Sequence, residues 1–221
     1  MIPVHLKRPK GQPSPRSTHY VVARNGLFLA KREWWVEAVV PVKRIKVLDS
    51  QAVSARLLMP KLPAEVFGRA LKALHQVYEI LQSESCVLVH YCKETGYELS
   101  MPPQEVNATH IKYNAKERLP GHLPVGAIHP HGTLPAFHSS VDCHDQCWWD
   151  GIHITVGHLG LYPEFSLAAQ MVVTGHRFPV DATWFEGLQG PTECGFYQLE
   201  CPANDAWEVP HEWLKNVHYA E

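Results

Sequence analysis

Two histidines, a serine and an aspartate stand at a regular spacing in the second half of this 221-residue chain. His129 and His131 are followed, after seven intervening residues, by Ser139 and then by Asp142. Imidazole nitrogens and a carboxylate are the usual ligands of a catalytic zinc ion, which takes three protein ligands and keeps the fourth tetrahedral position for water. The spacing therefore predicts that His129, His131 and Asp142 bind one catalytic Zn²⁺, with Ser139 beside them.

The residues around this group predict the elements that position it. The short apolar run at residues 125–128 is typical of a buried strand that leads into the histidines. On a strand, residues i and i+2 point to the same face, so both imidazoles can converge on one ion. Gly132 and Pro135 then predict a loop. Ser139 or Ser140 can cap a following helix, whose first turn would bring Ser139 and Asp142 to one face.

The pattern His-x-His-x7-Ser-x2-Asp resembles the JAMM motif of the JAB/MPN metalloproteases, which include deubiquitinating enzymes. The match is complete in residue type and spacing at all four positions. Pro130 and Gly132 depart from the family pattern, which usually has Ser and often Pro there, but neither departure removes a ligand. The flanking residues, with GIHITVGHL at 151–159, are most similar to the bacterial branch of the family. The resemblance covers roughly residues 60 to 190.

The resemblance implies a fold and an activity. The fold would be α+β, an MPN/JAB sandwich in which helices flank a mixed β-sheet. The activity would be zinc-dependent cleavage of a peptide or isopeptide bond after the C-terminus of a ubiquitin-like protein, in maturation or deconjugation. The implied partners are that protein and its conjugates. Ubiquitin-activating-like and ubiquitin-conjugating-like proteins, encoded beside bacterial members and in some cases in antiphage operons, would be further partners.

The family also requires an upstream glutamate as general base. Glu84 is the best candidate, because it lies where a helical pattern gives way to a strand-like run, 45 residues before His129. Glu79, about one helical turn earlier, is the alternative. Ser139 would donate a hydrogen bond to the developing oxyanion, and loss of one such donor typically lowers the rate by about 10²–10³.

Three alternatives stay open at this point. A metal-free MPN scaffold could bind protein partners without catalysis. A zinc hydrolase could act on small peptides or sulfur-carrier tails. Finally, Cys143, His144 and Cys147 could hold a second, structural zinc, although they supply only three of the four ligands that such a site needs.

Composition narrows the class of protein. The formal net charge of −2 and the pI of about 6.7 give no electrostatic argument for a nucleic-acid or membrane partner. No apolar run approaches the length of a membrane span, and the basic N-terminus lacks the apolar region of a secretory signal. Six cysteines without such a signal indicate reduced thiols. The sequence therefore predicts a cytoplasmic protein without nucleic-acid or membrane partners.

Four segments are expected along the chain. Residues 1–17, rich in Pro, Lys and Arg, predict a flexible arm. Residues 18–60 predict a small N-terminal β module, with a hairpin at Asn25-Gly26 and with Trp34 and Trp35 as anchors for a protein partner. Residues 61–190 form the predicted metalloprotease domain, and residues 191–221 a tail that packs on it through Trp207 and Trp213. Within the domain we expect a helix over 64–81, strands over 86–91, 97–100, 105–113, 151–159 and 165–175, and a turn at Arg177-Phe178.

Overall fold

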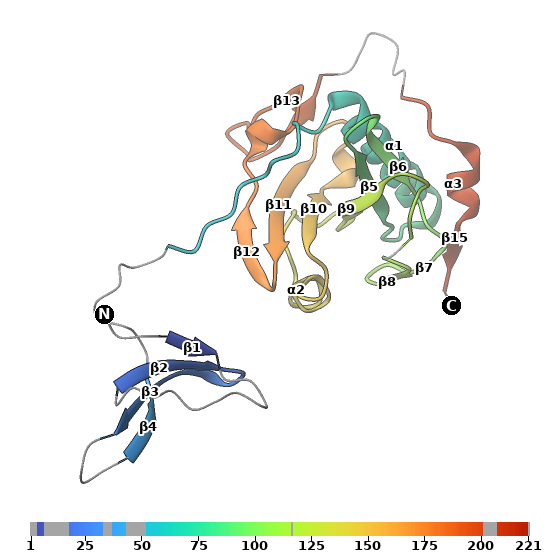
Figure 1. Ribbon diagram of the computed structural model, residues 1–221. Helices are drawn as coiled ribbons and strands as arrows, with labels where there is room; N and C mark the ends of the chain where they lie inside the picture. The colour runs from blue at the N-terminus through green and yellow to red at the C-terminus, as the bar shows by residue number, and fades with distance from the viewer. Residues whose placement is uncertain are drawn as a thin grey trace. The chain divides into compact units, whose positions relative to one another are not determined.

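The computed structural model describes residues 4–6, 18–32, 37–42, 52–115, 117–200 and 207–220. The chain divides into two compact units, Met1–Val53 and Ser54–Glu221. Figure 1 shows the elements of both, and the class is α+β, with β-strands predominating over three α-helices in the described residues. Across those residues, no helix is long and apolar enough to cross a membrane.

The N-terminal unit is a four-stranded sheet in the order β1-β2-β3-β4. Its strands are β1 (Val4–Leu6), β2 (Thr18–Ala23), β3 (Gly26–Arg32) and β4 (Glu37–Pro41). The hairpin predicted at Asn25-Gly26 joins β2 to β3, and Gly26 has a φ of 134° that favours glycine. Trp34 and Trp35 lie outside the described residues.

Strand β1 corrects one expectation. Val4–Leu6 pairs in parallel with β2, so the prediction of a flexible arm does not hold for these three residues. A parallel partner lies far along the chain, and a local pattern cannot reveal such a pairing. The rest of residues 1–17 lies outside the described part of the chain.

The second unit is built on a six-stranded sheet in the order β12-β11-β10-β9-β5-β6. Neighbouring strands are antiparallel except β9 and β10, which run parallel. The strands are β5 (Val87–Cys92), β6 (Gly96–Ser100), β9 (Leu123–Pro130), β10 (Gly151–Gly157), β11 (Ser166–Val173) and β12 (His176–Pro179).

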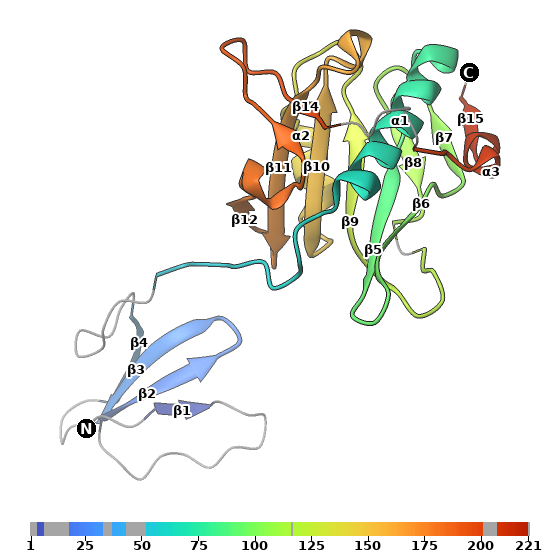
Figure 2. The same cartoon turned by 90° about the horizontal axis from the view of Figure 1, so that it is seen from above.

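Helix α1 (Ala64–Leu81) covers one face of this sheet, as Figure 2 shows. Its apolar stripe includes Phe67, Leu71 and Leu74, spaced at i, i+4 and i+7 and at most 1 % exposed. These side chains belong to the same buried core as Ile128 and Ile154 of the sheet. The helix ends at Leu81, and the C-cap residue Gln82 has a positive φ of 49° before the chain continues to β5.

The alternation along β10 separates the two faces of the sheet. Ile152, Ile154 and Val156 belong to the core shared with α1, so His153, Thr155 and Gly157 lie on the opposite face. Helix α2 (Ser140–Gln146) lies over that second face, where Gln146 Oε1 accepts a hydrogen bond of 2.6 Å from Gln170 Nε2 of β11. The polar positions of β10 therefore line the side of the sheet that carries the predicted site.

Two local predictions in this unit are wrong. The single strand expected over 105–113 is a pair, β7 (Gln104–Val106) and β8 (Ile111–Tyr113), and β15 (Val217–Tyr219) adds to β7 in parallel. Arg177 and Phe178 form part of β12 instead of a turn. The turn lies earlier, at residues 174–175, which both have positive φ and reverse the chain.

The C-terminal residues belong to the second unit. Trp207 and Trp213 are buried, as expected, and the indole of Trp207 lies so close to α1 that a Cβ added to Gly68 would come within 2.4 Å of it. The remaining short elements are the 3-10 turns η1 (Leu159–Leu161) and η2 (Ala182–Trp184), strands β13 (Leu188–Gln189) and β14 (Gln198–Leu199), and helix α3 (His211–Lys215).

Candidate metal centre

Strand β9 positions the two histidines. His129 is the second-last residue of the strand, and the N–H of His131 donates a 2.8 Å hydrogen bond to the Val156 carbonyl, which extends the pairing with β10. His129 lies opposite Thr155 in the register, on the face that α1 does not cover. Both histidines are buried, with 9 % and 8 % of the residue surface exposed.

The start of helix α2 positions the carboxylate. Ser139 is the N-cap, and its Oγ accepts a hydrogen bond from the Asp142 N–H (3.1 Å). In return, Asp142 Oδ2 accepts a hydrogen bond from the Ser139 N–H (2.7 Å), which completes a capping box. The orientation of the Asp142 side chain is thus fixed by the helix start itself.

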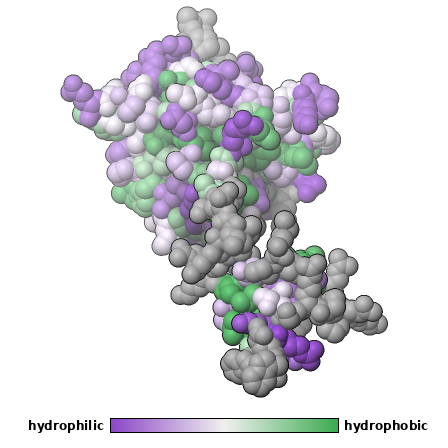
Figure 3. Space-filling view, turned by 60° about the vertical axis from the view of Figure 1, so that its left-hand side comes forward, coloured by the Kyte–Doolittle hydropathy of each residue, from purple (hydrophilic) through white to green (hydrophobic). Residues whose placement is uncertain are grey.

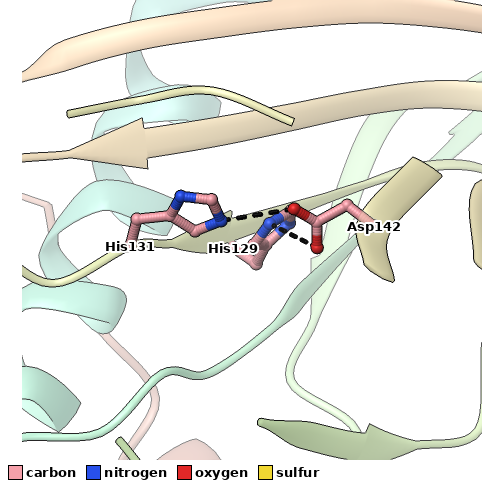
Figure 4. A group of neighbouring side chains, drawn as sticks. All are labelled: His129, His131 and Asp142. Atoms are coloured by element: carbon pink, nitrogen blue, oxygen red, sulfur yellow. Dashed lines mark ion pairs between the residues drawn. The ribbon is translucent and has the colours of Figure 1, made fainter. Parts of the chain in front are cut away.

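The three side chains converge from these two elements, as Figure 4 shows. His129 Nε2 lies 3.4 Å from Asp142 Oδ1, and His131 Nε2 lies 3.3 Å from Asp142 Oδ2. Two ligands of a tetrahedral zinc with bonds of about 2.0–2.1 Å are about 3.3–3.4 Å apart. The ligand atoms of all three residues lie within 4.8 Å of one another, so the group could hold a metal ion, and its N, N, O donor set suits zinc.

Within the described ranges, this is the one group of three or more His, Cys, Asp or Glu side chains with such geometry. Cys143, His144 and Cys147, the alternative zinc ligands, do not come together. Instead, the Cys147 thiol donates to the Cys143 carbonyl (3.1 Å), and Arg177 contacts both of these residues. The structure offers no support for the second metal site.

The electrostatics of the centre favour a cation. Burial opposes the charged form of Asp142, but hydrogen bonds from His129 and His131 outweigh it and lower the pKa of this carboxyl below its usual range. Burial lowers the pKa of both His138 and His153 to about 4, and the neighbouring His129 adds to the effect. These two histidines are therefore neutral at pH 7 and place no positive charge beside the ligands.

Glu84 lies within electrostatic reach of the same group. It follows α1 and precedes β5, and its backbone N–H donates to the Asn107 carbonyl (3.0 Å). Burial raises the pKa of Glu84, while His129 and His131 act in the opposite direction. Glu79, the alternative base, has a side chain that is 65 % exposed and lies 3.7 Å from His75. The charges of His129 and His131 thus act on the Glu84 carboxyl, whereas the ion-pair contact of Glu79 is with His75.

Gln104 holds the backbone of Cys86, two residues after Glu84. It is 2 % exposed, its Oε1 accepts from the Cys86 N–H (2.7 Å), and its Nε2 donates to the Cys86 carbonyl (3.0 Å). Burial raises the pKa of the Cys86 thiol to about 12. This thiol therefore stays protonated at neutral pH, which excludes it as a nucleophile or thiolate ligand.

The loop of residues 132–138 joins the histidines to α2 and rests directly on β10. A Cβ added to Gly157 would lie only 2.2 Å from the Ala136 nitrogen. Ser166 Oγ accepts from the Ala136 N–H (2.7 Å) and lies 2.9 Å from His158 Nδ1. The His158 N–H donates to the Leu134 carbonyl (2.9 Å). The path of the loop is thus set by β10, by the start of β11 and by the residue between β10 and η1.

Apolar side chains border the centre. Leu134, Phe137 and Val141 are 57 %, 46 % and 59 % exposed, and the Phe137 ring contacts the His131 ring with centroids 4.6 Å apart. We call these three residues the apolar rim. Phe137 thus presents apolar surface against His131, and Leu134 and Val141 are exposed on the loop and the helix that carry the site.

Sequence reasoning missed several supporting residues. Thr155 Oγ1 lies 3.4 Å from His129 Nε2 and 3.2 Å from His138 Nδ1. The sequence does indicate the position of Thr155, because its alternation with isoleucines along residues 151–157 assigns it to the face of the sheet that carries the histidines. Gln104 and Ser166 carry no comparable local signal, because their partners are distant in sequence.

No model of a known protein family matches the chain, and a search of curated proteins finds no match.

Proposed function

We propose that this chain is a zinc-dependent peptidase or isopeptidase of the JAMM type, that its second unit is an MPN/JAB sandwich, and that it cleaves after the C-terminus of a ubiquitin-like protein. The observation that carries the proposal is the convergence of His129, His131 and Asp142 at separations of 3.3 and 3.4 Å, which suit a tetrahedral ion. The resemblance of the motif to the JAMM pattern supplies the reaction class.

Each polar residue then has a task. A bound zinc ion would supply Lewis acidity and a water molecule whose pKa is lowered to about 7. Glu84, whose pKa is raised above its ordinary value by burial, takes up a proton and returns it to the leaving amine. Ser139 Oγ uses a lone pair to accept from the Asp142 N–H, so its own proton stays available to donate to the substrate carbonyl oxygen.

The apolar rim supports a polypeptide substrate over a small polar molecule. Its three side chains are about half exposed, Phe137 contacts His131, and burying them against a substrate chain is favourable. A ubiquitin-like tail would bind in extended form, by adding a strand to a sheet edge. The biological setting we propose is the cytoplasm, in a bacterial ubiquitin-like pathway of the antiphage type with activating-like and conjugating-like proteins as partners.

The test measures zinc per chain together with cleavage of a ubiquitin-like fusion protein. The proteins compared are wild type, Glu84→Gln and the matched control Glu79→Gln. We expect one zinc ion in each, full cleavage in wild type and the control, and a rate at least about 10²-fold lower in Glu84→Gln. Absence of both zinc and cleavage would replace the proposal with the scaffold alternative. Zinc with cleavage of short peptides alone would replace the substrate class.

A further inference from the structure

The imidazole of His138 has one nitrogen without a hydrogen-bond partner. Its Nδ1 lies 3.2 Å from Thr155 Oγ1, whereas its Nε2 is buried and forms no hydrogen bond within the part of the chain that the structure describes. A buried polar group without a partner destabilises a folded protein, and most such groups are paired. The buried Nε2 of His138 is therefore suited to pair with a bound ligand.

His138 lies beside the candidate metal centre. It is the last residue of the loop of residues 132–138 and directly precedes Ser139, the N-cap of α2. Thr155 Oγ1, which contacts its Nδ1, also lies 3.4 Å from His129 Nε2. The charges of all three candidate ligands act on the His138 imidazole. One hydroxyl group thus links His138 to a ligand, and the imidazole lies within electrostatic reach of the whole centre.

The contacts of Thr155 determine which nitrogen of His138 carries the proton. His129 Nε2 lies 3.4 Å from Asp142 Oδ1, which is an acceptor, so in the metal-free protein this nitrogen directs a proton to the carboxylate. In the zinc-loaded protein the lone pair of the same nitrogen would bind the ion. In both states His129 Nε2 cannot accept from the Thr155 hydroxyl, which therefore donates its proton to His138 Nδ1.

His138 Nε2 is then a hydrogen-bond donor. Burial lowers the pKa of His138 to about 4, so the ring is neutral at pH 7 and carries a single proton. Because Nδ1 accepts from Thr155, that proton lies on Nε2. The nitrogen without a partner is thus a buried N–H group, and the ligand that pairs with it must offer an acceptor.

Exposed apolar residues cannot take the place of such a donor. Figure 3 shows apolar residues among polar ones on the surface of the second unit, and residues of this kind stabilise a bound polypeptide by burial. Burial of apolar surface is non-directional, so it does not fix the position of one carbonyl oxygen. A hydrogen-bond donor does so, because the strength of a hydrogen bond depends on distance and angle.

We propose that the Nε2–H of His138 donates a hydrogen bond to the carbonyl oxygen of the scissile bond, together with Ser139 Oγ. This role rests on the peptidase activity proposed above and deepens it, since two donors on consecutive residues recognise the reacting group of the substrate. Negative charge develops on that oxygen during hydrolysis, and preorganised donors stabilise it. Thr155 is a positioning residue, because its hydroxyl keeps the His138 proton on Nε2.

Two substitutions distinguish the ring nitrogens. In His138→Gln an amide N–H lies close to the position of Nε2, whereas in His138→Asn it lies close to that of Nδ1. We expect His138→Asn to lower kcat for the ubiquitin-like fusion by about 10²–10³-fold with little change in KM. His138→Gln should be at least about tenfold faster than His138→Asn. His144→Asn is the control, since His144 is exposed on α2, and all these proteins should bind one zinc ion per chain.

The position of the His138 proton is measured independently of activity, from the nitrogen chemical shifts of the ring in the metal-free protein at pH 7. The His138 signals are assigned by their loss in His138→Asn. We expect the proton on Nε2 in the wild type and a mixture of both tautomers in Thr155→Val, which lacks the hydroxyl. A proton on Nδ1 in the wild type would overturn the donor role.

Two kinetic results would overturn the proposal as well. Equal kcat in His138→Asn and the wild type would show that the N–H pairs with a buried water molecule and not with the substrate. Equal losses in His138→Asn and His138→Gln would show that the ring itself, and not a donor at Nε2, is required. Absence of cleavage by the wild type would instead overturn the peptidase function, and with it the substrate of His138, even with the proton on Nε2. The failure of either proposal is therefore recognisable.

Discussion

Substitution of Gly157 by alanine tests whether the loop of residues 132–138 positions the metal centre. The added Cβ would lie 2.2 Å from the Ala136 nitrogen and 2.4 Å from the Leu134 oxygen. Ordinary contacts begin near 3.4 Å, so the loop backbone must move by about 1.2 Å. Overpacking by one methyl group costs about 1–3 kcal/mol, which lowers the Tm of a unit of this size by about 2–12 °C.

The same displacement reaches the ligands, because the loop connects His131 directly to the Ser139 cap. Misplaced supporting groups typically weaken metal binding by about 10–100-fold, and we expect a zinc affinity loss in this range. Gly160→Ala is the matched control, since its Cβ would meet only the Thr133 methyl group at 3.9 Å. The measurements are the Tm of the metal-free protein and zinc affinity by competition with a chelating dye. If Gly157→Ala matches the control in both, the loop does not position the centre.

Three further substitutions test other parts of the site. Asp142→Asn keeps an oxygen for the helix cap but loses the charged ligand, so zinc affinity should fall by more than about 100-fold. Helix content, measured by circular dichroism, should change little. The control Asp145→Asn, on the same helix, should bind zinc normally. Glu84→Gln should raise the Tm of the metal-free protein. Its folded-state pKa is raised above 4.5, so ionisation destabilises the fold, and the gain should be absent below about pH 4.5 and grow as pH rises through the folded-state pKa. An equal gain in Glu79→Gln would contradict this reasoning. Gln104→Ala leaves the buried Cys86 N–H without its acceptor and should lower the free energy of unfolding, measured in urea, by about 1–3 kcal/mol. An unchanged unfolding midpoint would show that water replaces the amide.

Local patterns were sufficient for the parts of the site that depend on short-range geometry. The i, i+2 spacing of His129 and His131 on a strand, and the three-residue step from Ser139 to Asp142 in a first helical turn, follow from backbone periodicity alone. The apolar stripe of α1 and the alternation along β10 likewise reveal which faces are buried. These are the features for which sequence spacing and spatial proximity coincide.

The remaining features depend on contacts between distant residues. The pairing of β1 with β2, and of β15 with β7, joins segments that no local pattern relates. The short strands β7 and β8 read as one strand, because the turn between them lacks a Gly or Pro signal. The contribution of Ser166 to the loop path depends on a hydrogen bond to Ala136 across 30 residues. Similarly, the net charge of −2 conceals an uneven distribution of charge. Residues 1–53 carry a formal charge of +7 and residues 54–221 one of −9, and this difference becomes visible only once the two units are distinguished.

The capping box at Ser139 and Asp142 has a consequence for how the site is assembled. One carboxylate oxygen both closes the first turn of α2 and lies 3.3 Å from His131 Nε2, so the ligand is oriented by folding before any ion arrives. In small zinc-dependent domains, by contrast, the binding free energy of the ion is the folding free energy. Here the entropy of ordering the ligands is lost when the polypeptide folds, together with the large apolar core. A chelator should therefore abolish the proposed peptidase activity reversibly while the protein keeps its structure. Exchange of the proposed zinc ion should be limited by access to the centre and not by refolding.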